Sequence, residues 1–295
     1  MIKWELMFKG VLNSKIHDTS TSLCIGIDPH FHGLPSFMKE MIEEKGSVYF
    51  LEWFGECMLN AAKKEAIPAI KLQSAFFEAY GKEGHVVMEN LIRKARNFGV
   101  LSILDAKRGD ISSTMEAYGK ASFDLMDADI LTVTPYMGYD VIKPLVPWLK
   151  NGKGIYVVWM SSNPSGKDIQ ELEGKDGKIA SETLFDLIES NAEKDGVLDG
   201  IGYVLGATKV NGLSENLYRK VKTRPMLMPG VGAQGADAKD PKLSAMLENK
   251  VHLVPISRGV SGYGQGYLDE ELLNSSENDY QEFVNSRVRE LKLTI

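Results

Sequence analysis

The sequence has few cysteines and no long apolar run, and each shortage excludes a class of protein. Its 295 residues include two cysteines, Cys24 within an apolar run and Cys57 within a helical pattern. Two such thiols do not make the disulfide framework of a small secreted protein, so we expect both to be buried and reduced. No apolar run approaches the roughly 18 residues of a membrane span, and the N-terminus lacks a secretory apolar region. We therefore expect a cytoplasmic protein that is neither exported nor inserted in a membrane.

The sequence also has no excess of basic over acidic residues. Lys and Arg number 34 against 40 Asp and Glu, for a formal net charge of -6. This balance argues against nucleic acid as a partner, because its phosphates attract a basic surface. It leaves room for a local basic site that binds a small anion. The length suits either two average domains or one large α/β barrel, and composition does not decide between them.

Eight short apolar runs, rich in β-branched residues, recur along the chain. Such runs are typical of parallel strands that helices cover on both faces. They span residues 22–29, 67–72, 100–107, 129–135, 154–160, 201–207, 225–229 and 251–258. Helical patterns lie between them, over 48–65, 85–98, 113–126, 139–150, 179–194, 214–221 and 236–248. The alternation favours one (β/α)8 TIM barrel domain over residues 1–295, with a doubly wound open sheet as the alternative.

Three further segments complete this barrel prediction. Residues 4–16 predict a helix that closes one end of the barrel before the first strand. A last amphipathic segment, with apolar residues at helical spacing from Tyr280 to Leu291, would complete the outer ring of helices. Residues 161–178 are rich in Gly, Ser, Asp and Lys and predict a long loop after the fifth strand. That loop is either a floppy insertion or a mobile lid, since barrel active sites are built from the loops after the strands.

The third apolar run ends in a cluster of charges. Asp105 and Lys107 are two residues apart, so in a strand their side chains project from the same face. Asp110 follows a turn at Gly109, within reach of both or of a neighbouring subunit. Two carboxylates around one ammonium group are costly to assemble and therefore suggest a functional site.

Polar residues also end or follow other predicted strands. Because the carboxyl ends of barrel strands meet at one mouth, these side chains are expected to gather there. Any one of them alone is equally well explained as a solvated loop residue, but the whole set predicts a site. Besides the cluster at Asp105, the set comprises Asp28, Lys71, Ser161, Ser162, Gln234, Ser257 and Arg258.

The seventh strand leads into a glycine-rich segment that begins at Pro229 and reads P-G-V-G-A-Q-G. Its backbone N–H groups and the guanidinium of Arg258 are suited to hold a phosphate, at the place where barrels commonly bind one. The glycines also spell the dinucleotide pattern G-x-G-x-x-G. They occur late in the chain, however, and the next strand ends in Ser257 and Arg258 rather than in a ribose-binding acid. The remaining alternative is a tight turn without a ligand.

An H-x-H pair, His30 and His32, follows the first strand and raises the possibility of a metal-dependent hydrolase. Such a site needs more ligands from other strands. The other histidines are His17, His85 and His252, and none of them follows a predicted strand. We therefore expect exposed loop histidines and no metal.

Lys107 suggests a second alternative, a Schiff-base nucleophile as in aldolase-type barrels. That chemistry requires a neutral amine, which enzymes obtain by desolvation or by nearby positive charge. Asp105 and Asp110 instead favour the charged ammonium. A fixed cation with acidic neighbours suits proton donation and stabilisation of a carbanion.

Taken together, these motifs resemble the orotidine 5'-phosphate decarboxylase family. The D-x-K-x-x-D pattern of Asp105, Lys107 and Asp110, Lys71 before it, and the glycine-rich segment with Arg258 after it carry the resemblance. It runs from Asp28 to Arg258, and the long first and fifth loops are similar to those of the family's longer subgroup. Gln73 departs from some relatives, which carry asparagine there.

The resemblance implies that orotidine 5'-phosphate loses CO2 to form UMP, the last step of de novo pyrimidine nucleotide synthesis, without metal or organic cofactor. By position, Lys107 would protonate C6 of the pyrimidine and Asp105 would lie against the departing carboxylate. Lys71 would order the charges and contact the ribose. A homodimer with shared sites is also implied, in which Asp110 and Thr114 reach into the partner subunit's site.

The same resemblance implies the substrate contacts. Asp28 would bind a ribose hydroxyl, and Ser162 or Ser161 the pyrimidine edge. Gln234 and Arg258 would bind the phosphate, with Pro229 and Ser257 beside them among the substrate-binding residues.

Two rival functions remain. The first is a related barrel that shares D-x-K-x-x-D but binds magnesium and acts on sugar phosphates. That group has a metal-binding acid at the end of the second strand, where this chain has Lys71. The second rival is a catalytically silent barrel that binds a nucleotide or serves as a scaffold, which has no need of the complete set of charges.

Overall fold

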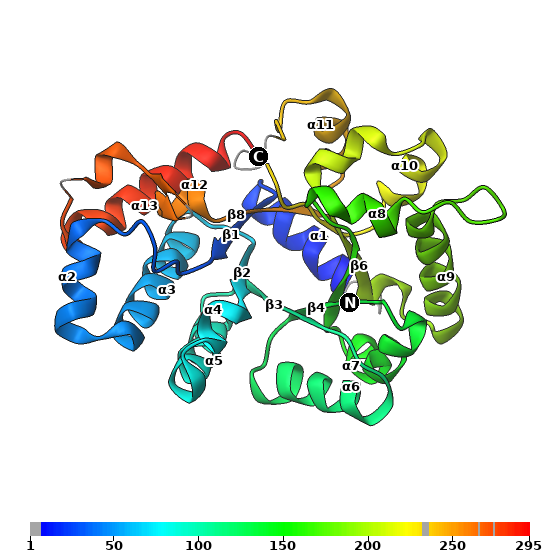
Figure 1. Ribbon diagram of the computed structural model, residues 1–295, viewed down its shortest axis with the longest axis horizontal. Helices are drawn as coiled ribbons and strands as arrows, with labels where there is room; N and C mark the ends of the chain where they lie inside the picture. Colours follow the sequence, from blue (N-terminus) through cyan, green and yellow to red (C-terminus); the bar gives the residue numbers. More distant parts are fainter. Residues whose placement is uncertain (1–6, 232–235, 265, 274) are drawn as a thin grey trace.

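Eight parallel strands close into a barrel in sequence order, with helices around it (Figure 1). The structure is a computed structural model that describes residues 7–231, 236–264, 266–273 and 275–295. Each strand falls within or next to a predicted apolar run, so the barrel is confirmed and the open sheet is excluded. The strands are β1 (Leu23–Ile27), β2 (Ala69–Gln73), β3 (Leu101–Arg108), β4 (Ile130–Val133), β5 (Gly154–Met160), β6 (Ile201–Leu205), β7 (Met226–Leu227) and β8 (His252–Ile256).

The outer helices match most of the predicted helical patterns. Those that flank the strands are α3 (Ser47–Lys64), α5 (Gly81–Asn97), α6 (Ser112–Gly119), α7 (Val146–Lys150), α9 (Ala180–Asp195), α10 (Glu215–Val221) and α11 (Pro241–Leu247). Four α-helices of the described residues were not predicted: α2 (Ser36–Lys45), α4 (Ser74–Glu78), α8 (Lys167–Gln170) and α12 (Arg258–Ser261). A small antiparallel pair, β9 (Tyr263–Gly264) and β10 (Tyr267–Leu268), follows α12.

Three of the predicted helices are wrong in length or regularity. The pattern at 139–150 breaks into two 3-10 turns and α7, because Pro144 and Pro147 lack the N–H groups that a continuous helix needs. The pattern at 236–248 becomes helical only at Pro241, where the Asp240 side chain accepts the free N–H groups of Lys242 and Leu243. The pattern at 113–126 ends in a π-helical turn over Lys120–Leu125.

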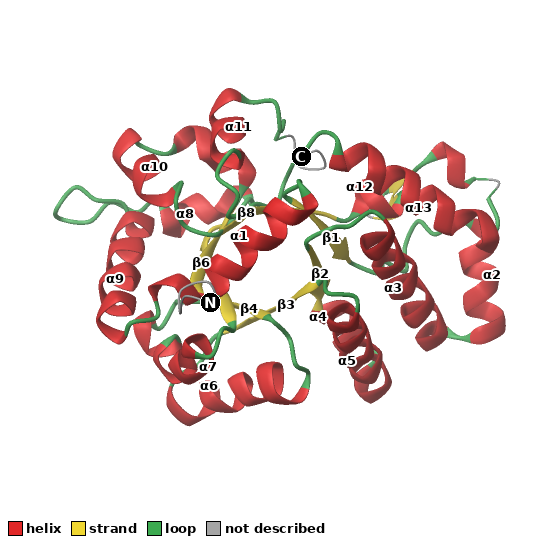
Figure 2. Ribbon diagram, turned by 180° about the vertical axis from the view of Figure 1, so that it is seen from behind, coloured by secondary structure: helices red, strands yellow, loops and turns green. Residues whose placement is uncertain are grey.

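Helix α1 (Phe8–Thr19) closes the N-terminal end of the barrel, as predicted, and crosses the strands in Figure 2. Its buried residues Phe8, Leu12 and Ile16 pack among the apolar side chains that fill this end of the barrel. The Phe8 ring meets the Tyr156 ring edge-on, with 5.4 Å between the centroids. Positions 4–6 of the predicted helix lie outside the described residues. Among the described residues α1 thus fills this end of the barrel, and the active sites of such barrels lie at the opposite end.

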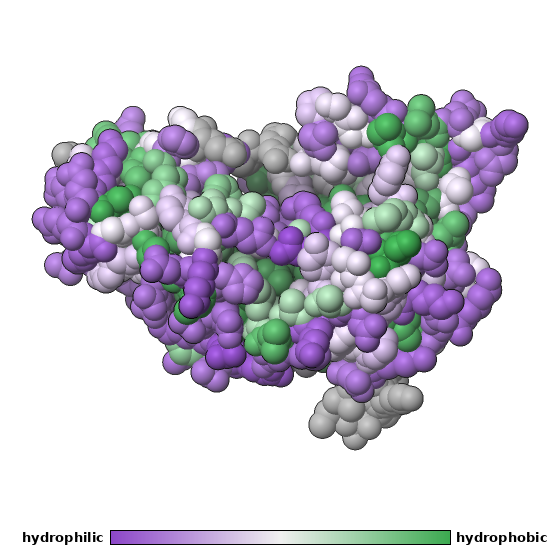
Figure 3. Space-filling view, turned by 60° about the horizontal axis from the view of Figure 1, so that its bottom comes forward, coloured by the Kyte–Doolittle hydropathy of each residue, from purple (hydrophilic) through white to green (hydrophobic). Residues whose placement is uncertain are grey.

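Helix α13 (Glu277–Lys292) completes the outer ring, as predicted. A capping box between Ser276 and Asp279 begins it, and its buried Tyr280 lies 5.2 Å from the Trp53 ring of α3. On the face shown in Figure 3, polar residues predominate and apolar residues form separate patches. No helix in the described part of the chain is long and apolar enough to cross a membrane.

Both cysteines are buried and free, as predicted. Burial raises the pKa of each thiol to about 12, well above the usual 9.0. Their thiolates, the reactive forms, are therefore scarce at neutral pH.

A buried histidine makes the stability depend on pH. His252 at the start of β8 is fully buried, with its Nε2 2.9 Å from the Lys222 carbonyl oxygen, and burial lowers its pKa from 6.5 to about 4. The unfolded chain therefore takes up a proton between these values that the folded chain does not. Because this proton binds only to the unfolded chain, it favours unfolding. The free energy of unfolding is therefore highest above pH 6.5 and declines as the pH falls toward 4.

From pH 7 to pH 5 the His252 contribution to the free energy of unfolding is expected to fall by about 2 kcal/mol. Urea unfolding of the wild type and of His252→Gln at both pH values measures it. The variant should lose less stability over this range than the wild type. An equal loss in both would show that His252 is not responsible.

Candidate active site

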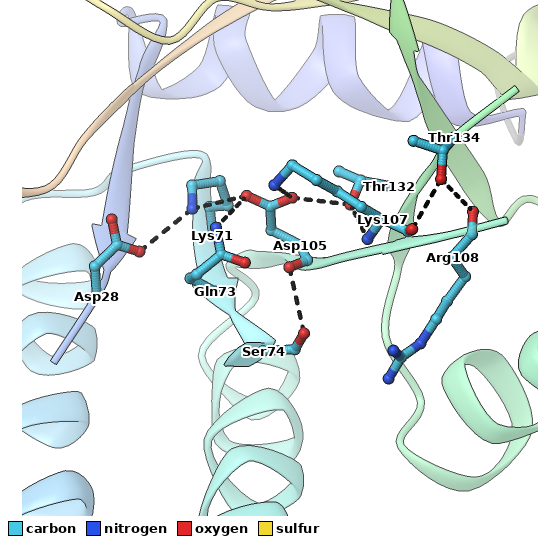
Figure 4. Close-up of polar contacts among 9 residues, drawn as sticks. All are labelled: Asp28, Lys71, Gln73, Ser74, Asp105, Lys107, Arg108, Thr132 and Thr134. Atoms are coloured by element: carbon cyan, nitrogen blue, oxygen red, sulfur yellow. Dashed lines mark hydrogen bonds and ion pairs between the residues drawn. The ribbon is translucent and has the colours of Figure 1, made fainter. Parts of the chain in front are cut away.

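Four charged side chains of alternating sign lie in a row at the open end of the barrel (Figure 4). Asp28 follows β1, Lys71 lies on β2, and Asp105 and Lys107 lie on β3. The Lys71 Nζ is 3.3 Å from Asp28 Oδ1 and 3.1 Å from Asp105 Oδ2. The Lys107 Nζ is 2.7 Å from Asp105 Oδ1. Each oxygen of Asp105 therefore faces a different ammonium group.

Burial distinguishes the inner and outer charges of this row. The side chains of Lys71 and Asp105 are each 9% exposed, whereas the Lys107 side chain is 46% exposed. Burial alone would raise the pKa of Asp105, but the adjacent Lys71 and Lys107 ammonium groups lower it to about 2. Burial likewise opposes the charge on Lys71, yet Asp28 and Asp105 raise its pKa above the usual value. Lys71 and Asp105 are thus both charged at neutral pH, and Lys107 is the most exposed member of the row.

Neutral side chains hold the Asp105 carboxylate in place. The Gln73 amide donates to Asp105 Oδ2 at 3.2 Å, and the Thr132 hydroxyl donates to Asp105 Oδ1 at 2.9 Å. The Ser74 hydroxyl lies 3.4 Å from the Asp105 carbonyl oxygen. A carboxylate with both oxygens occupied in this way has little freedom to turn.

The backbone at Lys107 is not a regular strand, and the assumption of regular alternation is wrong there. Leu104 of β3 pairs with Leu131 of β4 and the next pair is Arg108 with Val133, so β3 advances four residues while β4 advances two. Within this bulge Lys107 has a φ of 46°, in the left-handed region. The predicted contact with Asp105 is nevertheless present. A bulge next to an active site commonly re-aims a side chain.

Asp28 is held from the other side by the last strand. The Ser257 hydroxyl donates to Asp28 Oδ2 at 2.5 Å. A Cβ at Gly26 of β1 would lie 2.0 Å from the Ser257 Oγ, so the glycine leaves the space that this contact needs. Asp28 and Ser257 were both predicted as site residues, and in the structure they meet where β1 and β8 close the barrel.

Comparison with known proteins identifies the family. Residues 21–265 match the model of the orotidine 5'-phosphate decarboxylase / HUMPS family. The chain belongs to this family. It is 38% identical over 258 residues to the orotidine 5'-phosphate decarboxylase of Streptomyces coelicolor, covering 84% of this chain and 87% of that protein.

Solved structures of this family are similar over nearly the whole chain. A provisionally named orotidine 5'-phosphate decarboxylase from Streptomyces avermitilis has a TM-score of 0.70 and 31% identity, covering 96% of each chain. The OMP decarboxylase of Leishmania donovani has a TM-score of 0.66 and 25% identity, covering 95% of this chain and 98% of that one. The family resemblance drawn from the motifs is therefore confirmed.

In this family member the second acid of the D-x-K-x-x-D motif stands apart from the row of charges. Asp110 accepts a hydrogen bond from the Ile111 N–H at 2.8 Å. Within the described residues, no hydrogen bond or ion pair joins Asp110 to Lys71 or Lys107. Thr114 is exposed on α6. One chain alone therefore does not bring these two residues into its own charge row.

The two serines that follow β5, Ser161 and Ser162, lie in different environments. The Ser161 hydroxyl accepts from the Gln170 amide at 2.8 Å, and its N–H donates to the Gln170 Oε1 at 3.1 Å. Ser162 is half-buried beside Gly206, without a comparable side-chain contact among the described residues. Part of the long loop is ordered by α8 and by an isolated bridge between Glu173 and Ile179.

The predicted phosphate site is described only in part. Arg258 is half-buried as the first residue of α12, and the Pro229 carbonyl accepts from the Ala207 N–H at 2.8 Å. Gly230 has a φ of 106°, which favours glycine. Gln234 and the other residues of 232–235 lie outside the described residues.

The H-x-H pair divides between two environments. The His30 ring lies 4.6 Å from the Phe76 ring and is half-buried, which lowers its pKa, whereas His32 is exposed. The expectation of exposed histidines is therefore right for His32 and wrong for His30, because α4 and the segment around Gly264 cover its ring. In the part of the chain that the structure describes, no three His, Cys, Asp or Glu side chains form a group that could hold a metal ion.

Sequence reasoning missed Thr132 and Thr134, which contact the Asp105 and Lys107 segment. The signal was present, because residues two apart on a strand share a face. A hydroxyl at Thr132 that faces the interior of an apolar run needs a polar partner there.

Proposed function

We propose that this chain decarboxylates orotidine 5'-phosphate to UMP and CO2 without a cofactor, the last step of pyrimidine nucleotide synthesis. The row Asp28–Lys71–Asp105–Lys107 carries the proposal, because it concentrates fixed charge at the open end of a barrel. Membership of the decarboxylase family supports the choice of substrate.

The chemical step requires an anionic carbon to be stabilised. The bond between C6 and the carboxylate carbon breaks, CO2 leaves, and the electron pair remains on C6. The Lys107 ammonium then gives a proton to C6 and regains one from solvent. Without an electron sink in a cofactor, the stabilisation comes from preorganised charge, which is most effective where water is excluded.

The other charges of the row hold the Lys107 ammonium group in place and favour loss of the substrate carboxylate. Asp105, held by Lys71 and by Thr132, lies next to the Lys107 ammonium and would face the substrate carboxylate. Two negative groups close together favour the loss of one of them as neutral CO2. Lys71 balances Asp28 and Asp105 and contacts the ribose, and Asp28 binds a ribose hydroxyl.

Phosphate binding at the other end of the substrate would supply energy for ordering the site. Arg258 and Gln234, with Pro229 and Ser257 nearby, form the phosphate end in this proposal. Binding energy from a non-reacting group can serve to orient and desolvate the reacting one. At the pyrimidine edge we assign Ser162, because the Ser161 hydroxyl already accepts from Gln170.

The proposal includes a cytoplasmic homodimer with shared sites. Among the described residues Asp110 forms no hydrogen bond or ion pair with the row of charges in its own chain, and Thr114 is exposed, as expected of residues that complete a partner's site. Closed two-fold dimers exchange such contacts reciprocally, so both sites gain the same pair.

A magnesium-dependent sugar-phosphate enzyme of the same family is the rival function. In that function an acid on β2 would bind the metal, whereas here β2 presents the buried Lys71 ammonium. A fixed cation at this position repels a metal ion.

The deciding experiment compares two substrates on purified protein. The ultraviolet spectrum should change from that of orotidine 5'-phosphate to that of UMP, with one CO2 released per UMP formed. A ketose phosphate with formaldehyde tests the aldol-type alternative. Absence of turnover with orotidine 5'-phosphate, or efficient aldol chemistry instead, would refute the proposed function.

Replacing Arg258 by alanine is expected to raise KM for orotidine 5'-phosphate by about 10- to 100-fold, because charge-assisted hydrogen bonds to phosphate are lost. Steady-state kinetics measure the change. Arg219→Ala, which removes an exposed arginine of α10 paired with Glu215, is the matched control and should leave KM unchanged. An unchanged KM in Arg258→Ala would argue against its phosphate role.

A further inference from the structure

The Lys107 segment combines an unfavourable backbone conformation with an exact placement of its side chain. Lysine rarely adopts a positive φ, and such a residue persists only where its surroundings compensate. Here the φ is 46° and the Nζ lies 2.7 Å from Asp105. The bulge also removes Lys107 from the regular ladder between β3 and β4. Other groups must therefore satisfy its backbone.

We propose that Thr132 and Thr134 are positioning residues that hold Lys107 in this conformation and thereby place its ammonium group for the reaction. The inference rests on the proposed function, in which Lys107 donates the proton. The two threonines lie two residues apart, Thr132 on β4 and Thr134 just after it, and both contact the backbone of Lys107 (Figure 4).

Thr132 links both members of the catalytic pair through a single hydroxyl. Its oxygen accepts the Lys107 N–H at 2.9 Å, and its proton is donated to Asp105 Oδ1, also at 2.9 Å. A hydroxyl has one proton to give and lone pairs to accept with, so both bonds form together. Because Thr132 is fully buried, water does not readily replace either bond.

Thr134 holds the other side of the same peptide segment. Its hydroxyl donates to the Lys107 carbonyl oxygen at 2.9 Å, and its N–H donates to the Arg108 carbonyl oxygen at 2.8 Å. A Cβ at Gly109 would lie 2.6 Å from the Thr134 Oγ1, so the chain passes this hydroxyl closely. The N–H and the carbonyl of Lys107 are thus both bound by threonine side chains in place of ladder bonds.

The kinetic test uses Thr132→Val, which keeps the shape and removes the hydroxyl, and Thr132→Ser, which keeps the hydroxyl. Thr132→Val should lower kcat by about 10²-fold, because a displacement of about 1 Å can cost that much, while KM changes by less than about threefold. Thr132→Ser should restore kcat to within about fivefold of the wild type. Thr134→Val should lower kcat less, because it leaves the bridge to Asp105 intact.

The matched control is Thr21→Val. Thr21 is also fully buried, and its hydroxyl accepts the Leu23 N–H at 3.1 Å at the far end of β1. It should lose stability without losing kcat. If Thr132→Val keeps kcat within threefold of the wild type, or if Thr21→Val loses as much, the positioning role is refuted.

A crystal structure of Thr132→Val tests the inference independently of turnover. The Lys107 φ should leave the left-handed region, or its Nζ should move away from Asp105. A Lys107 segment unchanged from the wild type would refute the inference even if the enzyme is active. If the wild type does not turn over orotidine 5'-phosphate, the proposed function fails, and this structural comparison still decides whether the threonines hold Lys107.

Discussion

Replacing Lys107 by alanine is expected to lower kcat for orotidine 5'-phosphate by at least about 10⁴-fold, because the change removes both the proton donor and the cation nearest the developing carbanion. The row of charges would then end at Asp105, with a carboxylate and no ammonium group toward the opening. Single-turnover kinetics on the purified variant measure the loss.

Binding should survive this change, since the phosphate and ribose contacts come from other residues. The affinity for UMP, measured by calorimetry, should stay within about tenfold of the wild type. The matched control is Lys220→Ala, which removes an ion pair with Asp186 on the outer helices and should leave kcat unchanged. A Lys107→Ala variant that keeps more than a tenth of the wild-type kcat would contradict the assigned role.

Mixing two inactive variants is expected to restore activity if Asp110 acts across the dimer. Asp110→Ala and Lys107→Ala should each be inactive as pure proteins. In a mixed dimer, one site combines the intact Lys107 of one chain with the intact Asp110 of the other. With random exchange of equal amounts, half of the dimers are mixed, so about a quarter of the wild-type activity should return.

The control for this experiment is a mixture of Lys107→Ala with Asp105→Ala. Both residues lie in the same chain's row of charges, so no mixed dimer contains an intact site. Native mass spectrometry verifies that subunits have exchanged. Verified exchange without recovery in the Asp110 mixture would place Asp110 in its own chain's site and refute the shared dimer site.

The barrel was predictable because its strands are buried on both faces. A short, continuous apolar run such as that of β5, between two helical patterns, is typical of a buried parallel strand. Helices α4 and α12 were not predictable in the same way. Helix α4 has five residues and α12 has four, and at such lengths no apolar period can be recognised.

The irregular parts of the site depend on contacts that no local pattern shows. The sequence predicted the Asp105 and Lys107 pair from strand alternation, and the pair is present for a different reason. A bulge against β4 turns Lys107 into the left-handed region, and Thr132 and Thr134 bind its backbone there. Only the register between β3 and β4 reveals this, and register is set by the whole sheet rather than by the segment.

Two of the predicted site residues belong to the proposed dimer rather than to one chain's row of charges. Asp110 and Thr114 were predicted from the family resemblance, and among the described residues no hydrogen bond or ion pair joins them to the row of charges. In the proposed dimer, their roles depend on how a second copy packs. By contrast, Asp28 and Ser257 were predicted separately, and the closure of the barrel brings them together.

In the proposed function, fixed protein charges perform the decarboxylation without a metal. The most direct test is kcat/KM for orotidine 5'-phosphate after exhaustive dialysis against EDTA, with metal content verified by elemental analysis. We predict a value within twofold of the untreated enzyme, because Lys71 occupies the place that a metal would need. A loss of more than tenfold that added magnesium restores would contradict the account.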